Sequence, residues 1–382
     1  MSRKKILVVG DCISGSGLTE VIFNIFRKIK DEYEVTLIGY GEDKSNEIEE
    51  RCKKLKWKFY RTPLVNKHPI DHWIFWKKFF NNHKFEIVYF NYSSSWNFLP
   101  VIFAKKAGTQ IVVCHSHNSN YSHRFNNRIL MLGLDTLNSI GRKIFDKYAD
   151  KKVATSKEAA AWMFGKKNLN NIYISINGVD TRKFSFQKNC REYIREKYHL
   201  VGKEVIGFVG VLQDRKNPLF ALKVFYKIKK RRKNSVMVMI GKGPLLSKID
   251  DEIKRLNLNN SVIQIPYSSE VNKWYSAMDV LLFPSLHEGL PLVLIEAQIS
   301  GLNIVSSKNI STLAYVNPNV KRVSLKDVNS WANTASNLLN TEFDRSRPLK
   351  KIEKFSNDTQ AKNIKKILSD KYEKDFTNRH DR

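Results

Sequence analysis

The sequence predicts an α/β protein made of two doubly wound domains, each built on a largely parallel sheet. Short buried strands alternate with amphipathic helices along the 382 residues, which is the pattern that parallel sheets require. The pattern is interrupted once, by a segment of turn residues near the middle of the chain, and then repeats. A chain of this length can form two domains of ordinary size, each with its own core.

The first half opens with a buried strand at Lys5–Gly10 and an amphipathic helix at Leu18–Lys30. Further apolar runs complete the strands of this half: Glu34–Tyr40, Phe85–Phe90, Gln110–Cys114, Val153–Ser156 and Ile172–Ile176. The segment Asn177–Phe186 carries turn residues and loses the periodicity. We therefore expect the first domain to cover residues 1–180.

The second half repeats this pattern and is expected to form a domain over residues 187–354. Each of its predicted strands is followed by a plausible helix; the strands are Val205–Val211, Val236–Ile240, Val262–Ile265, Val280–Phe283 and Asn303–Ser306. The last segment, residues 355–382, begins with an amphipathic helix over Phe355–Tyr372. One face of that helix carries Ala361, Ile364 and Ile367.

The chain has a strong excess of basic residues, with 66 Lys and Arg against 37 Asp and Glu and a net charge of +29. Such a charge favours acidic partners: nucleic acid, an anionic membrane face or phosphorylated small molecules. A general bias toward basic residues is the alternative explanation. No aromatic and basic pattern of a known RNA-binding module occurs, so an interpretation as a nucleic-acid-binding protein depends on charge alone.

The composition also predicts the compartment. No apolar run approaches the roughly 18 residues of a membrane span. The N-terminus lacks the long apolar core and the cleavage site of a signal peptide. The cysteines have no metal-ligand spacing and are interpreted as reduced thiols: Cys12, Cys52, Cys114 and Cys190. These features predict a cytoplasmic protein.

The segment Val280–Gly301 is the most informative part of the chain, and it predicts a buried strand, a short loop and a helix. Pro291 suits the first helical turn, and Gly301 suits the position just after a helix. Glu288 then lies in the loop, and Glu296 lies about one turn inside the helix. Two carboxylates therefore flank a helix start.

The same loop offers backbone amides to a ligand. The N–H groups of Gly289, Leu290 and the first helical turn have no partners inside the helix, so they attract anions. Carboxylates beside such a site need hydroxyl groups from which to accept hydrogen bonds. A sugar nucleotide supplies both, because its diphosphate suits the amides and its ribose and hexose hydroxyls suit the glutamates.

The Glu288-x7-Glu296 segment, preceded by Phe-Pro-Ser, resembles the donor-site signature of family 4 glycosyltransferases, which have the GT-B fold. The resemblance implies two Rossmann-like domains that face each other across a cleft, with the C-terminal helix crossing back to the first domain. It also implies that Glu288 contacts the transferred sugar and Glu296 the ribose. The alternative is an ordinary strand–loop–helix with two solvated glutamates.

A pair of cations follows the strand Val205–Val211, in the loop that leads to the next helix. The guanidinium of Arg215 can bind a phosphate with two parallel hydrogen bonds, and Lys216 adds a point charge. Together they could neutralise a leaving diphosphate without a metal ion. The family carries an arginine directly after the glycine Gly210, but this chain has Val211 there, so Arg215 is the candidate substitute. A solvated basic turn is the alternative.

Other loops resemble the family's donor site more weakly. The first loop lacks the glycine spacing of a dinucleotide fingerprint, but part of it aligns with a Gly-Gly pair that lies over the donor diphosphate. A permissive turn is the alternative there. Two later loops resemble the strand-end glycine loop and the loop beside the nucleobase. The residues in these three loops are Ser16, Gly17, Gly241, Gly243 and Tyr267.

The polar run His115–Asn118 follows a predicted strand, at the end where a ligand cleft is expected. It resembles a subgroup that makes bacterial capsular and exopolysaccharides. In related enzymes a histidine here touches the transferred sugar, and His117 is the better candidate than His115. A hydrogen-bonded structural histidine and a metal ligand are the alternatives. His-x-His without a nearby carboxylate is a weak metal signal, so no metal site is predicted.

Two basic helical segments are candidates for contact with anionic lipid. For His72–Phe80 we favour a core helix with a basic outer face. For Arg124–Lys147 a membrane-bound helix and an ordinary surface helix remain equal alternatives.

Together these observations predict a hexosyltransferase whose catalytic residues are His117, Arg215, Lys216 and Glu288. The resemblance implies retention of configuration, a nucleoside diphosphate sugar with uridine as the favoured base, and a polyprenyl-diphosphate-linked saccharide as acceptor. It places the protein in cell-surface polysaccharide biosynthesis, peripherally bound at the inner face of the cell membrane. We expect no metal and no other cofactor.

Two alternatives keep the fold and change the function. Because the family arginine is missing at Val211, the chain could be a non-catalytic partner that binds a sugar nucleotide beside an active glycosyltransferase. It could also be a sugar-nucleotide epimerase or hydrolase, which would release an epimerised or free sugar in place of a glycan.

Overall fold

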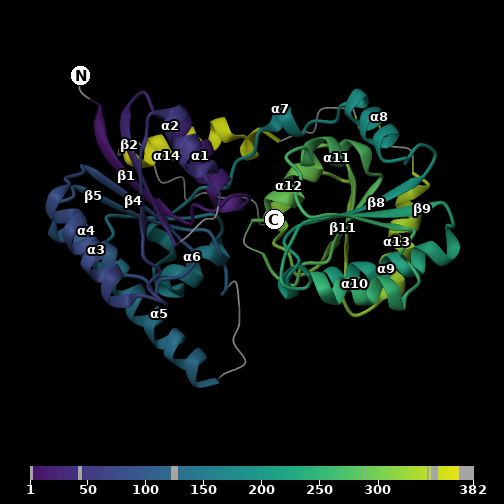
Figure 1. Cartoon of the computed structure of the whole chain (residues 1–382). Coiled ribbons are helices and arrows are strands. Elements are labelled where there is room, and N and C mark those ends of the chain that lie inside the picture. Colours follow the sequence, from purple (N-terminus) through teal and green to yellow (C-terminus); the bar gives the residue numbers. More distant parts are fainter. Residues whose placement is uncertain are drawn as a thin grey trace. The chain divides into compact units, whose positions relative to one another are not determined.

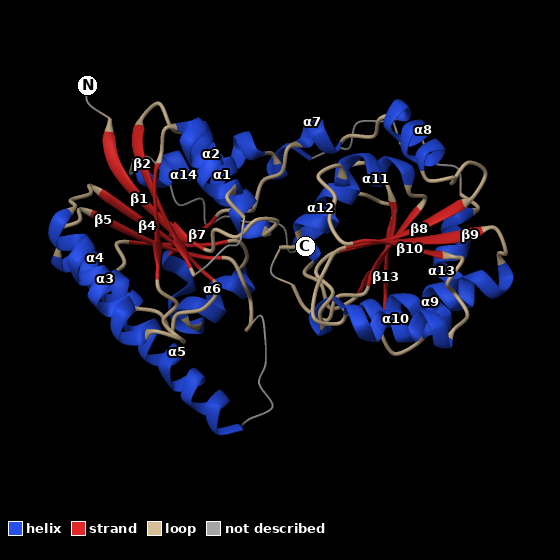
Figure 2. Ribbon diagram, in the orientation of Figure 1, coloured by secondary structure: helices blue, strands red, loops and turns tan. Residues whose placement is uncertain are grey.

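The computed structural model describes residues 3–41, 45–121, 128–288, 290–341, 344–345 and 352–369. The chain divides into two compact units (Figure 1). Unit 1 consists of Met1–Gly178 with Asn357–Arg382, and unit 2 consists of Val179–Ser356. In each unit a parallel sheet lies between two layers of helices (Figure 2).

Unit 1 contains a seven-stranded parallel sheet in the order β3-β2-β1-β4-β5-β6-β7. The strands are β1 (Lys4–Gly10), β2 (Tyr33–Tyr40), β3 (Lys58–Thr62), β4 (Ile87–Tyr92), β5 (Ile111–Ser116), β6 (Lys151–Ala154) and β7 (Ile172–Ile174). The order reverses between β1 and β4. A ligand site is expected at such a switch point, outside the carboxyl ends of the strands.

The helices of unit 1 cover both faces of this sheet (Figure 2). One layer contains α3 (Pro69–Asn82), α4 (Leu99–Lys106), α5 (Arg128–Tyr148) and α6 (Lys157–Phe164), which the 3-10 helix η1 (Lys166–Asn171) follows. The other layer contains α1 (Gly17–Lys28), α2 (Glu47–Leu55) and α14 (Asn357–Leu368). The prediction that His72–Phe80 forms a core helix is confirmed, because α3 buries four large side chains: His72, Trp76, Phe79 and Phe80.

Helix α14 is the returning C-terminal helix, and it packs against α1 (Figure 1). The three apolar residues predicted to share one face are buried: Ala361, Ile364 and Ile367. Two ion pairs border the contact, Lys28 to Asp358 at 2.6 Å and Lys365 to Glu32 at 2.5 Å. Burial of this apolar face therefore attaches α14 to α1.

Unit 2 contains a six-stranded parallel sheet in the order β10-β9-β8-β11-β12-β13. The strands are β8 (Glu204–Val209), β9 (Ser235–Ile240), β10 (Val262–Ile265), β11 (Val280–Phe283), β12 (Asn303–Ser307) and β13 (Val320–Val323). Its switch point lies between β8 and β11, so the loops that follow these two strands lie next to each other.

The helices of unit 2 also form two layers (Figure 2). One contains α9 (Pro218–Arg231), α10 (Leu246–Arg255) and α13 (Val328–Leu339); the other contains α7 (Thr181–Phe184), α8 (Lys188–Lys197), α11 (Val271–Ala277) and α12 (Leu292–Ile299). Short 3-10 helices occur at η2 (Asp214–Lys216), η3 (Thr312–Ala314) and η4 (Ile352–Phe355).

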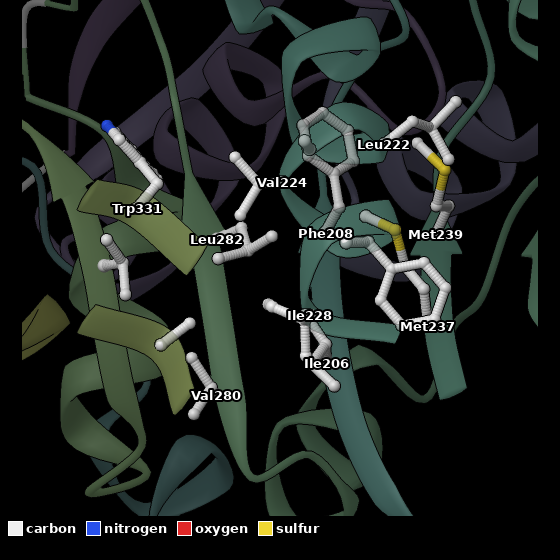
Figure 3. Packing of buried hydrophobic residues seen from close by; sticks show 14 of the residues in the cluster. Ile206, Phe208, Leu222, Val224, Ile228, Met237, Met239, Val280, Leu282 and Trp331 are labelled. Atoms are coloured by element: carbon white, nitrogen blue, oxygen red, sulfur yellow. The ribbon is translucent and has the colours of Figure 1, made fainter. Parts of the chain in front are cut away.

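A dense apolar core holds β8 and β11 in place (Figure 3). Ile206 and Phe208 of β8 and Val280 and Leu282 of β11 pack under the helices α9 and α13, and Trp331 of α13 is fully buried. Each large side chain buried in this way contributes about 1.5–3 kcal/mol. The core therefore fixes the two strands whose ends carry the candidate site.

Two strands, β3 and β13, were not predicted. Both are edge strands, and their residues are mostly half-buried or exposed. An edge strand of this kind needs no continuous apolar run, so the alternation that identified the other strands is absent from Lys58–Thr62 and Val320–Val323.

Candidate active site

The loops after β8 and β11 meet at the switch point of unit 2. The backbone N–H of Leu286 donates to the carbonyl of Arg215 at 2.8 Å, and the side-chain amide of Asn217 donates to the carbonyl of Pro284 at 3.4 Å. Asn217 has a positive φ of 57° and ends the 3-10 helix η2, directly before α9 begins at Pro218. This turn keeps Arg215 and Lys216 next to the loop that carries Glu288.

Glu288 forms ion pairs with both predicted cations. The ammonium of Lys216 lies 2.6 Å from Oε1 of Glu288, and Nη1 of Arg215 donates to Oε2. The exposed fraction of the side chain is 7% for Glu288, 11% for Lys216 and 22% for Arg215. The two cations and the first glutamate of the signature therefore form one largely buried cluster.

Burial and charge act against each other in this cluster. Burial disfavours the ionised form of Glu288, but the charges of Lys216 and Arg215 outweigh it and hold the pKa of the carboxyl below its usual value. Burial lowers the pKa of Lys216, and the nearby Glu288 opposes that shift. Two cations share one carboxylate, so the cluster has a positive excess that an anion can neutralise.

The glycines of the neighbouring loops are required by backbone packing. A Cβ on Gly241 would lie 2.0 Å from the carbonyl oxygen of Gly210, and one on Gly243 would lie 2.4 Å from that of Leu212. Gly210 and Gly241 also have positive φ values, 148° and 149°. The N–H of Gly210 donates to the carbonyl of Ile240 at 2.9 Å. These residues hold the loops after β8 and β9 together.

Two other predicted positions lie at the surface. The side chain of Tyr267 follows β10 and is 60% exposed, so a planar group could stack on it. Val211 is 48% exposed in the loop after β8 and supplies no charge where the family has an arginine. Arg215 and Lys216 are the cations that reach Glu288 from that loop.

Helix α12 carries the second glutamate of the signature. The hydroxyl of Tyr275, on α11, donates to Oε2 of Glu296 at 3.1 Å. Pro291 occupies the N-cap of α12, one position earlier than predicted, and no side chain of the described residues caps this end of the helix. The side chain of Leu290 is buried, and Gly289 lies outside the described residues.

The prediction that Gly301 ends this helix is confirmed. Gly301 has a φ of 62°. Its N–H donates to the carbonyl of Gln298 at 2.9 Å, and the N–H of Leu302 donates to the carbonyl of Ala297 at 3.1 Å. These two bonds form a Schellman motif, which satisfies carbonyls left free at a helix end.

Unit 1 carries the predicted histidine at the carboxyl end of its sheet. Nε2 of His117, directly after β5, lies 3.0 Å from Oδ1 of Asn91 on β4, and its ring centroid lies 4.0 Å from that of His115. Burial lowers the pKa of His117 to about 3. His117 is therefore neutral at physiological pH, so any contact with a sugar is a hydrogen bond of an uncharged imidazole.

The loop after β1 leads into α1 in unit 1. Ser16 is the N-cap residue of α1 and Gly17 is its first residue, and Gly17 is exposed. Thr19 accepts a hydrogen bond from the N–H of Ile13 at 3.0 Å and donates to the carbonyl of Asp11 at 2.8 Å, which fixes the shape of the loop. The start of α1 is therefore presented at the switch point of this sheet.

Sequence reasoning did not identify Tyr275 or Asn91. Asn91 is a buried polar residue near the end of β4, and its amide donates to the carbonyl of Val9 at 3.1 Å. A polar side chain near the end of an apolar strand was a signal that could have indicated it. Tyr275 lies 21 residues before its partner Glu296 on a different helix, and nothing in the sequence pattern pairs them.

The described residues contain neither a candidate metal site nor a candidate membrane span. In that part of the chain, no group of three or more His, Cys, Asp or Glu side chains is arranged to hold a metal ion. None of the described helices combines the length and apolar character needed to cross a membrane.

Both halves of the chain match known protein families. Residues 191–360 match the family of glycosyl transferases group 1, and residues 15–183 match glycosyltransferase family 4. The two matches together span most of the chain and meet close to the boundary between the units.

Individual relatives and structures agree with these matches. A Bacillus subtilis (strain 168) protein named as a glycosyltransferase, EpsF, is 27% identical over 345 residues, which is 87% of each chain. An Escherichia coli UDP-Gal:alpha-D-GlcNAc-diphosphoundecaprenol alpha-1,3-galactosyltransferase is 32% identical over 164 residues, 41% of this chain and 42% of that one. Anabaena Alr3699/HepE, solved with UDP-glucose, has the same fold, with a TM-score of 0.78 at 15% identity over 96% of this chain and 100% of that one.

Proposed function

The chain belongs to the GT-B glycosyltransferases that combine family 4 and group 1 domains, and from this premise we propose that it transfers a hexosyl unit from a UDP-sugar to a lipid-linked saccharide. The process would be the synthesis of a cell-surface polysaccharide, with retention of anomeric configuration. The observation that carries the proposal is the buried cluster of Arg215, Lys216 and Glu288. The names of the relatives support the donor and acceptor classes, since one of them is a UDP-Gal galactosyltransferase that acts on a diphosphoundecaprenol.

In this proposal the cations bind the departing diphosphate. Arg215 and Lys216 stabilise the negative charge that develops as the bond from the sugar C1 to the diphosphate breaks. The amides of Leu290 and of the first turn of α12 share this role, and the sequence assigns it also to Gly289, which lies outside the described residues. The acceptor oxygen forms the new bond to C1 on the same face and passes its proton to a diphosphate oxygen. No metal ion or other cofactor takes part in this scheme.

The remaining predicted residues hold the donor. Once the diphosphate has taken the place of Glu288 beside the cations, Glu288 accepts hydrogen bonds from hydroxyls of the transferred sugar. Glu296 accepts hydrogen bonds from the ribose hydroxyls. Tyr267 lies beside the base, and the strand-end loop of Gly241 and Gly243 belongs to the donor site. The resemblance assigns a sugar contact to His117 and a position over the diphosphate to Ser16 and Gly17.

The proposal is tested with a panel of UDP-, GDP- and ADP-sugars. We expect a UDP-sugar to raise the melting temperature most, and to yield UDP and a saccharide longer by one residue when a polyprenyl-diphosphate-linked saccharide is added. Nuclear magnetic resonance of the new linkage would report its configuration. Release of a free or epimerised sugar in place of the longer saccharide would contradict the proposed transfer.

The position Val211 favours a second candidate function. A chain without the family arginine could bind the sugar nucleotide and serve as the non-catalytic partner of an active enzyme. Tight binding of a UDP-sugar, with no UDP released in the presence of any lipid-linked acceptor, is the result expected of such a partner.

Helix α5 is the surface of unit 1 that we propose for contact with an anionic membrane. Its side chains Ile129 and Leu137 are exposed, by 84% and 42%, and Ile140 follows on the same side of the helix. Lys143 and Lys147 extend this surface with positive charge. An amphipathic helix of this kind can lie in the plane of a bilayer and use its cations to attract acidic lipids.

We expect the variant Ile129→Glu/Leu137→Glu to lose most binding to vesicles that contain phosphatidylglycerol, because two carboxylates would face the lipid headgroups. Co-sedimentation measures the bound fraction. Val201→Glu, at an apolar residue of unit 2 that is 68% exposed, is the matched control and should bind as the native protein does. Equal binding of the double variant and the native protein would remove α5 from the membrane contact.

A further inference from the structure

Tyr275 is a buried aromatic residue whose hydroxyl reaches one of the signature glutamates. Its side chain is 0% exposed on α11, and its ring lies 6.0 Å from that of Phe184. Its hydroxyl donates to Oε2 of Glu296 at 3.1 Å. This contact joins two helices, α11 and α12, which pack against each other.

The direction of this hydrogen bond is fixed by chemistry. Burial raises the pKa of Tyr275 well above its usual value, and the charge of Glu296 acts in the same sense, so the hydroxyl keeps its proton. An ionised carboxylate can only accept. Tyr275 therefore donates to one oxygen of Glu296, and any ligand that binds this carboxylate has to donate as well, as a hydroxyl does.

The contact also separates two charged parts of the site. Lys216 is close enough to Glu296 for that carboxylate to raise the pKa of the lysine. The two cations form their ion pairs with Glu288. The hydroxyl of Tyr275 binds Glu296 from the side of α11.

We propose that Tyr275 is a positioning residue for the donor: it holds Glu296 in the orientation that accepts hydrogen bonds from the ribose hydroxyls of the nucleotide. This inference rests on the proposed function, because it assumes a nucleoside diphosphate at the end of β8 and β11. It adds a residue from α11, outside the signature segment, to the determinants of ribose recognition.

The test compares two nucleotides in the native protein and in Tyr275→Phe, which removes one oxygen atom. Titration calorimetry measures Kd for UDP and for 2′,3′-dideoxyuridine 5′-diphosphate, which lacks both ribose hydroxyls. We expect the native protein to prefer UDP, and Tyr275→Phe to reduce that preference about three- to tenfold through weaker UDP binding. Glu296→Ala should remove most of the preference for UDP. The double variant Tyr275→Phe/Glu296→Ala should show the same residual preference as Glu296→Ala alone.

Tyr226→Phe, on α9 beside Lys230, is the matched control and should leave the preference unchanged. If Tyr275 had a purely structural role, Tyr275→Phe would weaken the binding of both nucleotides equally. An unchanged ratio of the two Kd values would therefore overturn this inference alone. Additive effects of Tyr275→Phe and Glu296→Ala would also overturn it. Failure of the native protein to bind either nucleotide would overturn the proposed function together with the inference.

Discussion

Glu288→Gln is expected to reduce sugar transfer by orders of magnitude and, at the same time, to tighten the binding of UDP. The substitution would keep the shape of the side chain but remove the negative charge that Arg215 and Lys216 share in the native protein. The two cations would then interact more strongly with a diphosphate, while the sugar would lose the carboxylate that orients it. We expect transfer to fall by about 10²–10³-fold, the scale of loss for a group that stabilises a transition state, and Kd for UDP to fall severalfold.

The same variant should show a characteristic stability. Removal of one partner from a buried ion pair costs about 3–5 kcal/mol, because it leaves a buried charge uncompensated. We therefore expect Glu288→Gln to melt at a lower temperature than the native protein without a ligand, and to gain more stability from UDP. Transfer assays, calorimetry and thermal unfolding measure the three effects.

Glu270→Gln is the matched control for this experiment. Glu270 forms an ion pair with Lys273 at the surface of the same unit, and both side chains are about one-third exposed. This substitution should change neither transfer nor UDP affinity, since an ion pair at the surface contributes little free energy. Native transfer by Glu288→Gln would show that Glu288 does not orient the sugar.

Much of the architecture was predictable because most strands are buried on both faces. A strand such as β11, in which every residue is buried, produces an apolar run that no surface helix or loop imitates. The edge strands β3 and β13 were missed for the opposite reason. Their half-exposed residues carry no such run, and only hydrogen bonding to a neighbouring strand makes them part of the sheet.

The residue types of the site were predictable, but their contacts were not. Arg215 and Glu288 are separated by 73 residues, and they meet only because β8 and β11 are neighbours in the sheet. Strand order results from the packing of the whole unit, and local periodicity does not encode it. The contact between Tyr275 and Glu296 likewise depends on how α11 and α12 pack, so only a three-dimensional structure could indicate it.

Arg215→Met is expected to reduce transfer by about 10²-fold, because in the proposed function Arg215 supplies the charge that the family places at the position of Val211. UDP should also bind more weakly, in contrast to its tighter binding by Glu288→Gln. The opposite signs follow from one arrangement, in which a carboxylate and a diphosphate compete for the same cations. Arg231→Met, at an exposed arginine of α9, removes a positive charge elsewhere in unit 2 and should leave both transfer and UDP binding unchanged.

A second substitution tests whether Arg215 replaces the family arginine. In Val211→Arg/Arg215→Met the guanidinium returns to the position directly after Gly210, where the exposed side chain of residue 211 has room for it. If the two positions serve one function, this double variant should transfer sugar at least about tenfold faster than Arg215→Met. A tenfold difference corresponds to about 1.4 kcal/mol in the activation barrier. Undiminished transfer by Arg215→Met alone would show that the diphosphate does not depend on this cation, and the binding site would then have to be sought around Lys216 and α12.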